Sequence, residues 1–125
     1  MLNDVKSDIV AKNVIITKVA GETIPANKVI YVNDKAYLAS SNQVAHRDRI
    51  VGVSVAAAVI SANITIRTFG EMYNNTWSWD VAKPIFCGLN GELTQTAPAS
   101  GFSCIIGNAI DTDRIFVIIQ DSILL

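Results

Sequence analysis

The sequence predicts an all-β fold, a compact sandwich or barrel of short strands that contains two copies of one hairpin unit. Three observations predict it. Short segments rich in β-branched residues are separated by turn signals every ~8 to 12 residues, which is typical of all-β domains. Asn90-Gly91 stands between two apolar runs, a strong hairpin signal because both central residues of a type I′ turn need positive φ. Finally, when the sequence is compared with itself at an offset that places Lys28 on Lys83, two parts of the chain match.

This shift of 55 positions aligns residues 28–39 with residues 83–94, and then Ile50-Val51-Gly52 with Ile105-Ile106-Gly107. Within the hairpins it pairs Ile30 with Ile85, Tyr31 with Phe86, and Leu38 with Leu93. One offset that spans two motifs indicates a repeated supersecondary unit. We expect that unit to be a strand, a turn, a strand, a loop, and a strand with glycine near its middle.

Composition limits the classes of function. The chain has 125 residues, and we expect an N-terminal arm over 1–13 followed by a single β domain over 14–125. Charged residues make up 17%, against about 25% in an ordinary soluble domain, while 50% are hydrophobic, so part of the apolar surface is expected to lie in an interface. The net charge of −1 without a run of like charges argues against a nucleic-acid partner.

No targeting or membrane segment is expected. No apolar run approaches the ~20 residues that a membrane-spanning helix needs, and the N-terminus lacks the apolar block of a signal peptide. Cys87 and Cys104 lack a CxxC spacing and lie in apolar runs, so we expect two buried thiols rather than a disulfide. These features fit a protein made in a reducing cytoplasm without membrane insertion.

The first half of the chain predicts strands in the following order. Residues 14–19 are rich in β-branched side chains and form the first strand, and a turn containing Pro25 leads into the hairpin over 28–39. A polar loop over 39–48 precedes a strand that begins at Ile50. Residues 63–68 alternate between polar and apolar and predict a half-buried strand, which Gly70 bends or bulges.

The second half begins with an unusual segment, residues 73–80, which contains two tryptophans. The hairpin over 83–94 follows it, and then a loop over 97–101. We expect a strand over 102–110, a turn at Asp111-Thr112-Asp113, and a last strand over 114–120.

No catalytic constellation is visible in the sequence. The carboxylates are scattered, and Asp111 and Asp113 are typical of a solvated turn. His46, the only histidine, has no recognisable nucleophile and orienting partner, so a surface-loop role is favoured. A His-x-His pair, a Gly-x-Gly-x-x-Gly and a Gly-Lys-Ser/Thr are all missing. We therefore predict a protein that is not an enzyme and needs no metal or cofactor.

The segment over 73–80 carries the candidate binding residues. Trp77 and Trp79 are two apart, so on an extended backbone both indoles project from one face. With Tyr73 they could form a platform on which sugar rings stack, while Asn74, Asn75 and Asp80 make hydrogen bonds to a glycan. The alternative, which we favour, is that one or both indoles fill a core or an interface.

Several short motifs occur in a characteristic order. They are Ala20-Gly21-Glu22-Thr23-Ile24-Pro25-Ala26, Ala45-His46 before Arg49-Ile50-Val51-Gly52-Val53, Gly70 ahead of Trp77-Ser78-Trp79, Lys83-Pro84-Ile85-Phe86, Gly91-Glu92-Leu93-Thr94-Gln95-Thr96-Ala97-Pro98 with Ser100-Gly101-Phe102, Ile106-Gly107-Asn108-Ala109, and Ile119-Gln120 before Ile123-Leu124-Leu125. In this order and spacing, over residues 14 to 125, the chain resembles a module of tailed-bacteriophage virion proteins found in tail fibres, spikes and related surface proteins.

The resemblance implies a homotrimeric, β-rich, non-enzymatic component of the virion. It transfers no binding residue, because the shared motifs look like turn and core positions. The chain departs from long fibres in lacking a repetitive shaft, and from central spike tips in lacking a His-x-His iron site. Two roles stay open. One is an attachment module in the virion tail, contacting other tail proteins and a host-surface glycan; the other is a decoration or cementing protein on the capsid.

The C-terminus predicts where subunits meet. The chain ends in Ile123-Leu124-Leu125, with no charged side chain after Asp121. An apolar end of this kind in water favours aggregation, and packing against symmetry mates removes it from water. We therefore expect Ile123, Leu124 and Leu125 to be buried between the subunits of a closed homotrimer.

Overall fold

The computed structural model describes residues 13–125, so residues 1–12 of the expected arm over 1–13 lie outside the described residues. The described chain is all-β, as predicted: it has eleven strands, two short 3₁₀ helices and no α-helix. The strands are β1 (Val14–Val19), β2 (Val29–Asn33), β3 (Lys35–Leu38), β4 (Ile50–Ser54), β5 (Asn63–Tyr73), β6 (Pro84–Cys87), β7 (Leu93–Thr94), β8 (Phe102–Ser103), β9 (Ile105–Asp111), β10 (Arg114–Ile118) and β11 (Ile123–Leu124). The 3₁₀ helices are η1 (Val44–His46) and η2 (Leu89–Gly91).

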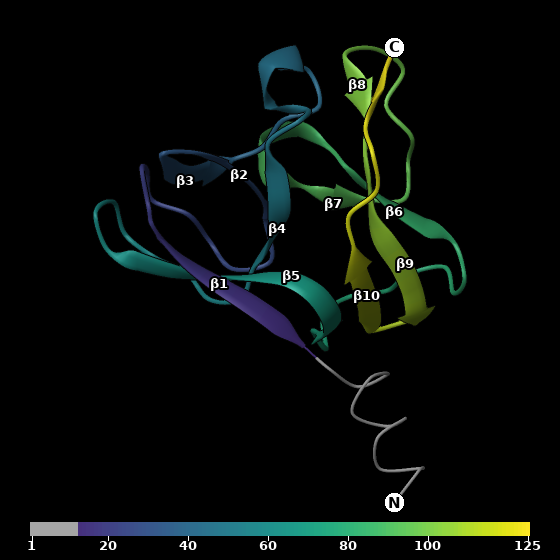
Figure 1. Cartoon of the computed structure of the whole chain (residues 1–125). Coiled ribbons are helices and arrows are strands. Elements are labelled where there is room, and N and C mark those ends of the chain that lie inside the picture. Colours follow the sequence, from purple (N-terminus) through teal and green to yellow (C-terminus); the bar gives the residue numbers. More distant parts are fainter. Residues whose placement is uncertain (1–12) are drawn as a thin grey trace, which may run out of the picture.

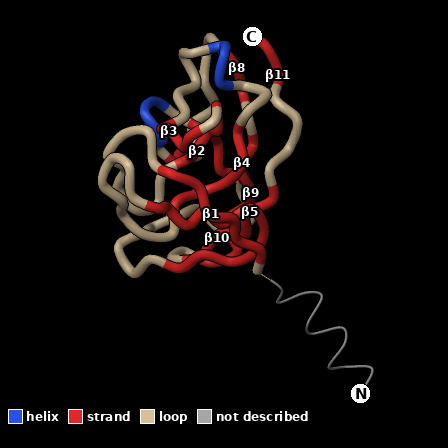
Figure 2. Tube along the Cα trace, turned by 60° about the vertical axis from the view of Figure 1, so that its left-hand side comes forward, coloured by secondary structure: helices blue, strands red, loops and turns tan. Residues whose placement is uncertain are grey.

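Nine strands form one curled, antiparallel sheet in the order β3-β2-β4-β5-β10-β9-β6-β7, with β1 paired to β5 off this path. The curl gives the sheet the shape of a half-barrel (Figure 1). β8 and β11 form a separate two-stranded sheet beside the C-terminus, at the end of the molecule opposite the start of β1 (Figure 2). Within the described residues, no helix is long and apolar enough to cross a bilayer.

The long strand β5 joins the two halves of the sheet. Its first part pairs with β1 and β4, and its second part, from Phe69 to Tyr73, pairs with β10. Gly70 lies at the change, with φ +117, a conformation that disfavours residues with a Cβ. The bend expected at Gly70 therefore exists inside one continuous strand and does not end it.

The repeat predicted from the sequence is present in the strand register. In the first unit (β2–β5), Ile30 pairs with Gly52 and Tyr31 with Ile50. In the second unit (β6, β7, β9 and β10), the residues 55 positions later pair in the same way, Ile85 with Gly107 and Phe86 with Ile105. Both ladders shift register at the same step, so Ile30 and Ile85 occupy equivalent positions.

The same physical constraint explains the glycine in each unit. A Cβ on Gly52 would collide with the carbonyl oxygen of Arg67 on β5, and a Cβ on Gly107 with that of Phe116 on β10. In both units the following strand therefore passes so close that only glycine fits.

The hairpin turns of the two units differ in length. In the first hairpin Asp34, with φ +67, is the one residue between the paired Asn33 and Lys35. The second hairpin contains η2, in which Asn90 and Gly91 have φ +52 and +80 and the Glu92 N–H donates to the Leu89 carbonyl at 3.0 Å. This geometry is that of the predicted type I′ turn.

The longer turn corrects one part of the predicted repeat. Leu38 pairs with Ile30, whereas Leu93 pairs with Cys87, so Leu38 and Leu93 are not equivalent. The two extra turn residues move the returning strand along its partner. The expected strand over 102–110 is also divided into β8 and β9, the last expected strand ends at Ile118, and β11 was not anticipated.

Two apolar cores fill the fold. The smaller core lies inside the first unit, where β1 and the Ala20–Ala36 bridge bring the sheet edges together. Its buried members are Ala20, Ile24, Ile30, Ala36, Ala58, Ile64 and Ile66. The larger core lies between the units and contains Val29, Ala39, Val53, Met72, Ile85, Cys87, Phe102, Cys104, Ile106, Ala109, Ile115 and Val117. Val29 and Val53 therefore join the first unit to the second.

Candidate binding surface around Trp77 and Trp79

The segment that connects β5 to β6 is held against the end of the β9–β10 hairpin by backbone hydrogen bonds. The Asn74 N–H donates to the carbonyl of Asp113 at 3.0 Å, and the Trp79 N–H to that of Thr112 at 2.8 Å. Ala82 closes the segment by donating to Ala109 at 2.8 Å. The predicted binding residues are thus presented on an anchored connection between two strands.

Side chains fix the local conformation further. The Asn74 side-chain oxygen accepts from the backbone N–H of Thr76 at 2.9 Å and from its hydroxyl at 2.7 Å, an Asx turn. The Gln95 side chain accepts from the Asp80 N–H and donates to the Asp80 carbonyl, both at 2.8 Å. These bonds occupy the Asn74 oxygen and leave the exposed Asp80 carboxylate near Lys83, at 3.6 Å.

The two indoles are half-buried and pack against the larger core. Their ring centroids are 5.6 Å apart and their planes are inclined by 53°, so they do not form one flat platform. Nε1 of Trp79 is buried and has no hydrogen-bond partner within the described residues. Both indoles therefore contribute to packing, the alternative favoured from the sequence, while part of each ring remains in contact with solvent.

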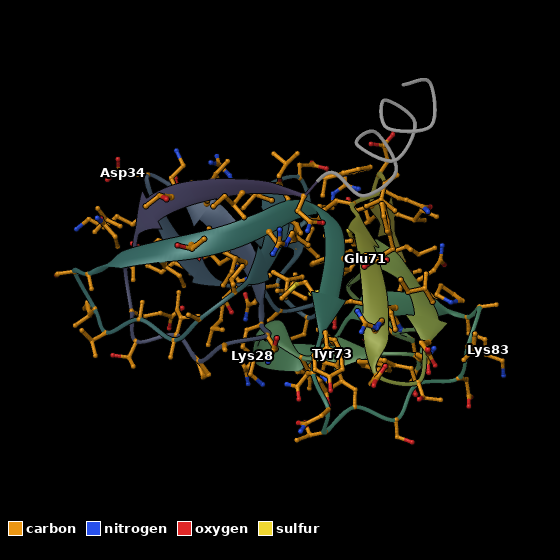
Figure 3. All side chains as sticks on the ribbon, turned by 90° about the horizontal axis from the view of Figure 1, so that it is seen from below. Lys28, Asp34, Glu71, Tyr73 and Lys83 are labelled. Atoms are coloured by element: carbon orange, nitrogen blue, oxygen red, sulfur yellow. The ribbon has the colours of Figure 1, made fainter. Side chains whose placement is uncertain are left out.

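Tyr73 belongs to a different environment from the indoles. It ends β5, where Figure 3 labels it, and is 55% exposed. The Arg114 guanidinium lies 4.9 Å from its ring centroid, a cation–π contact on the side of the sheet that faces away from the core. Asn75 is exposed. Of the six predicted residues, Tyr73 thus ends β5, and the other five lie on the connection that follows it.

Sequence reasoning missed a second surface, a groove of about 390 Å³ between η2 and the loop over 96–100. Hydroxyl, amide and carboxyl groups from three separate segments line it, and they include Ser41, Asn42, Glu92, Thr94, Thr96 and Ser100. Its size lies within the range of ligand sites. No sequence motif marks it, because the segments meet only in the folded chain.

His46 packs against other side chains of the fold and is not the freely exposed loop residue that the sequence favoured. Its ring stacks on Tyr31 with 3.8 Å between centroids, and Tyr31 stacks in turn on Tyr37. Its Nδ1 accepts from the Ser40 N–H at 3.1 Å. Burial lowers the pKa of His46 below its ordinary value, and the carboxylate of Glu22 opposes that shift. The imidazole is thus a structural acceptor in its neutral form.

The groups that could carry chemistry are dispersed. Residues 13–125 contain no cluster of three or more His, Cys, Asp or Glu side chains that could hold a metal ion. Cys87 and Cys104 are buried free thiols, and burial raises the pKa of Cys87 to about 12 and that of Cys104 to about 11. Both thiols therefore remain protonated and act as small apolar side chains at neutral pH.

Comparison with known proteins gives the class of fold. No protein-family model matches the sequence, and no curated protein matches it. Among solved structures, the chain is similar to the crystal structure of the head fiber gp8.5 N base in bacteriophage phi29, with a TM-score of 0.53 and 15% identity. The match covers 90% of this chain and 98% of that one. The likeness is one of fold, and it extends over almost the whole of both chains.

Proposed function

We propose that this chain is a structural protein of a bacteriophage virion, displayed on the particle surface and without enzymatic activity. The observation that carries this proposal is the fold shared with the phi29 head fiber base over 90% of the chain. The resemblance of its sequence motifs to tailed-phage surface modules supports the same class independently of that fold.

Placement on the head, as a fibre base or decoration protein, is the location we favour. The support is that the solved structure it resembles is named a head fiber. A tail location was our first expectation from the sequence, and it remains the second candidate. Antibody labelling of purified virions distinguishes them: label on capsids supports the head, label on tail tips supports the tail, and unlabelled particles that lack the chain contradict the virion role.

We propose a homotrimer as the assembled form. Ile123, Leu124 and Leu125 are 64%, 55% and 55% exposed, and the Leu125 N–H is bonded to the Gly101 carbonyl at 3.0 Å. The C-terminal strand is thus held in place while its apolar side chains lie open to solvent. Deleting residues 123–125 should lower the mass measured by light scattering from trimer to monomer, and an intact trimer would remove these residues from the interface.

Attachment to a host-surface glycan is a second candidate function, supported by the exposed parts of Trp77 and Trp79. A glycan array probed with the wild-type protein should give a signal that Trp77→Ala abolishes. Because Trp77 packs on the core, Asn75→Ala and Asp80→Ala serve as variants that leave the packing unchanged. A signal that survives all three changes would exclude this segment and direct attention to the groove lined by Glu92 and Ser100.

A further inference from the structure

The second unit of the repeat leaves open a face that the first unit buries. Val29 and Val53 of the first unit lie in the larger core, packed against the second unit. The residues 55 positions later are Pro84 and Asn108, which pair with each other but belong to neither core. Within residues 13–125, the second unit thus has a sheet face without a packing partner where the first unit has one.

This outer face is built in rows across β5, β10, β9 and β6, because paired residues of neighbouring strands project to the same side. Figure 1 shows β5, β10 and β9 side by side. Phe69 pairs with Ile118, and Phe86 pairs with Ile105. Phe116 pairs with both Glu71 and Asn108. We define the outer face by the residues Phe69, Glu71, Tyr73, Pro84, Phe86, Ile105, Asn108, Arg114, Phe116 and Ile118.

The outer face is strongly apolar for an open surface. The rings of Phe69 and Phe116 meet edge to face with 5.1 Å between centroids, and both side chains are half-buried without belonging to a core cluster. Ile118 lies two residues after Phe116 on β10 and pairs with Phe69, so it projects to the same side, and it is 42% exposed. Contiguous aromatic and aliphatic side chains of this kind mark a protein interface.

The chemistry of the face selects its occupant. The polar side chains of the face are Glu71, Tyr73, Asn108 and Arg114, and the rest of it is apolar. Arg114 is the one cation among the residues of the face, too few for nucleic acid or an anionic membrane. Glu71 and Arg114 supply charges of both signs at one end of it, where Figure 3 labels Glu71 on β5. In a closed trimer whose subunits turn this face toward the three-fold axis, apolar side chains can meet apolar ones, and Glu71 of one copy can lie near Arg114 of the next.

We propose that the outer face is the surface through which copies of this chain pack against one another. It rests on the homo-oligomer proposed above and assigns the contact to a sheet face distinct from the C-terminal residues. In the assembly, the neighbouring copy gives Phe69, Phe116 and Ile118 the cover that the second unit gives Val29 and Val53 within one chain.

The test introduces charge or bulk on the face and measures assembly of the full chain by light scattering and sedimentation. Ile118→Glu and Asn108→Arg should convert the oligomer to monomer at micromolar concentration, because a charge or a long side chain enters the contact. Asn108 is exposed, so this variant removes no packed side chain. Matched controls are Ile60→Glu, at an isoleucine that is 59% exposed in the β4–β5 loop, and Asn63→Arg, at an exposed asparagine of β5.

The outcomes separate this proposal from the others. If the wild type assembles and the two outer-face variants do too, the outer face is not the contact, whatever the role in the virion. If the controls dissociate as readily as the outer-face variants, the effect is not specific and the proposal is also lost. A monomeric wild-type chain overturns both the homo-oligomer and this interface, while virion labelling tests the virion role separately.

Discussion

The two units of the repeat share their strand register and differ in what covers them. In the first unit, β1 and the segment around Ile24 close one face over Ile30, and the second unit covers the other face at Val29 and Val53. In the second unit, one face forms the larger core around Ile85, and no element of the described chain packs on the other. The same ladder thus becomes a closed barrel or an open sheet according to what is packed on it.

This difference indicates that register does not depend on the core composition of each unit. The register is set locally, by a shift at the same step of both ladders and by a glycine that faces the next strand. Substitutions at equivalent positions can therefore distinguish the effects of the shared register and glycines from the effects of the different cores.

The largest effects are expected at the two glycines. Gly52→Ala and Gly107→Ala each drive a methyl group into the carbonyl oxygen of the next strand, so each should destabilise the fold by more than about 3 kcal/mol. Urea unfolding followed by circular dichroism measures both losses. Gly88→Ala is the control, because its new Cβ would meet chiefly the flexible Glu92 side chain. Unequal costs at Gly52 and Gly107 would show that the units are not equivalent at this position.

The equivalent isoleucines test whether the two cores act as one cooperative unit. Ile30 and Ile85 are both fully buried, so Ile30→Ala and Ile85→Ala should each cost about 2 to 5 kcal/mol. Because Val29 and Val53 connect the units, one unfolding transition is expected for each variant. Tryptophan fluorescence reports the larger core and far-UV circular dichroism the whole sheet. Non-coincident transitions after Ile30→Ala would mean that the small barrel unfolds independently.

Replacement of Ser54 should cost less stability, and it concerns the first unit only. Its buried hydroxyl donates to the Pro25 carbonyl at 2.7 Å and accepts from the Lys28 N–H at 3.0 Å, whereas the equivalent residue of the second unit is Ala109. Ser54→Ala leaves the Lys28 N–H without this acceptor and should cost about 1 to 3 kcal/mol. Exposed Ser78 is the control for the same substitution. A neutral Ser54→Ala would mean that the first unit tolerates the alanine of the second.

The sequence predicted the features that depend on local chemistry. The β class, the Asn90-Gly91 turn, the repeat of Ile30 and Ile85 and the bend at Gly70 follow from residue type and spacing, and the structure confirms them. The different strand pairing of Leu93 and Leu38 could not be predicted, because it depends on how many residues of each hairpin remain unpaired in the turn. Nor could the groove near Glu92 or the outer face, since their residues meet only through pairing of distant strands.

The candidate binding residues show the same limit. The two-residue spacing of Trp77 and Trp79 correctly indicated neighbouring indoles, but it could not give the 53° inclination between the rings or their packing on the larger core. Tyr73 is drawn to Arg114 by a cross-strand pairing that no local pattern reveals. Backbone anchoring of this segment to Thr112 and Asp113 likewise depends on a hairpin more than thirty positions away.

The smallest expected effect is a pH dependence that belongs to the first unit alone. Its 39–46 loop carries His46, whereas the residue 55 positions later is Gly101. Because burial lowers the pKa of His46 in the folded state, the unfolded chain binds a proton more readily as the pH falls below about 6.5. The contribution of His46 to the free energy of unfolding is therefore fully present above that pH and decreases below it. Protonation also removes the Nδ1 acceptor from the Ser40 N–H.

A urea-denaturation series between pH 7.5 and pH 5 should give a free energy of unfolding that falls toward acid. His46→Gln should flatten that slope, since glutamine offers an acceptor to Ser40 without titrating in this range. His46 remains partly exposed to solvent, so the effect should be modest and should not unfold the chain by itself. Equal slopes for wild type and His46→Gln would assign the acid sensitivity to the carboxylates and remove this difference between the two units.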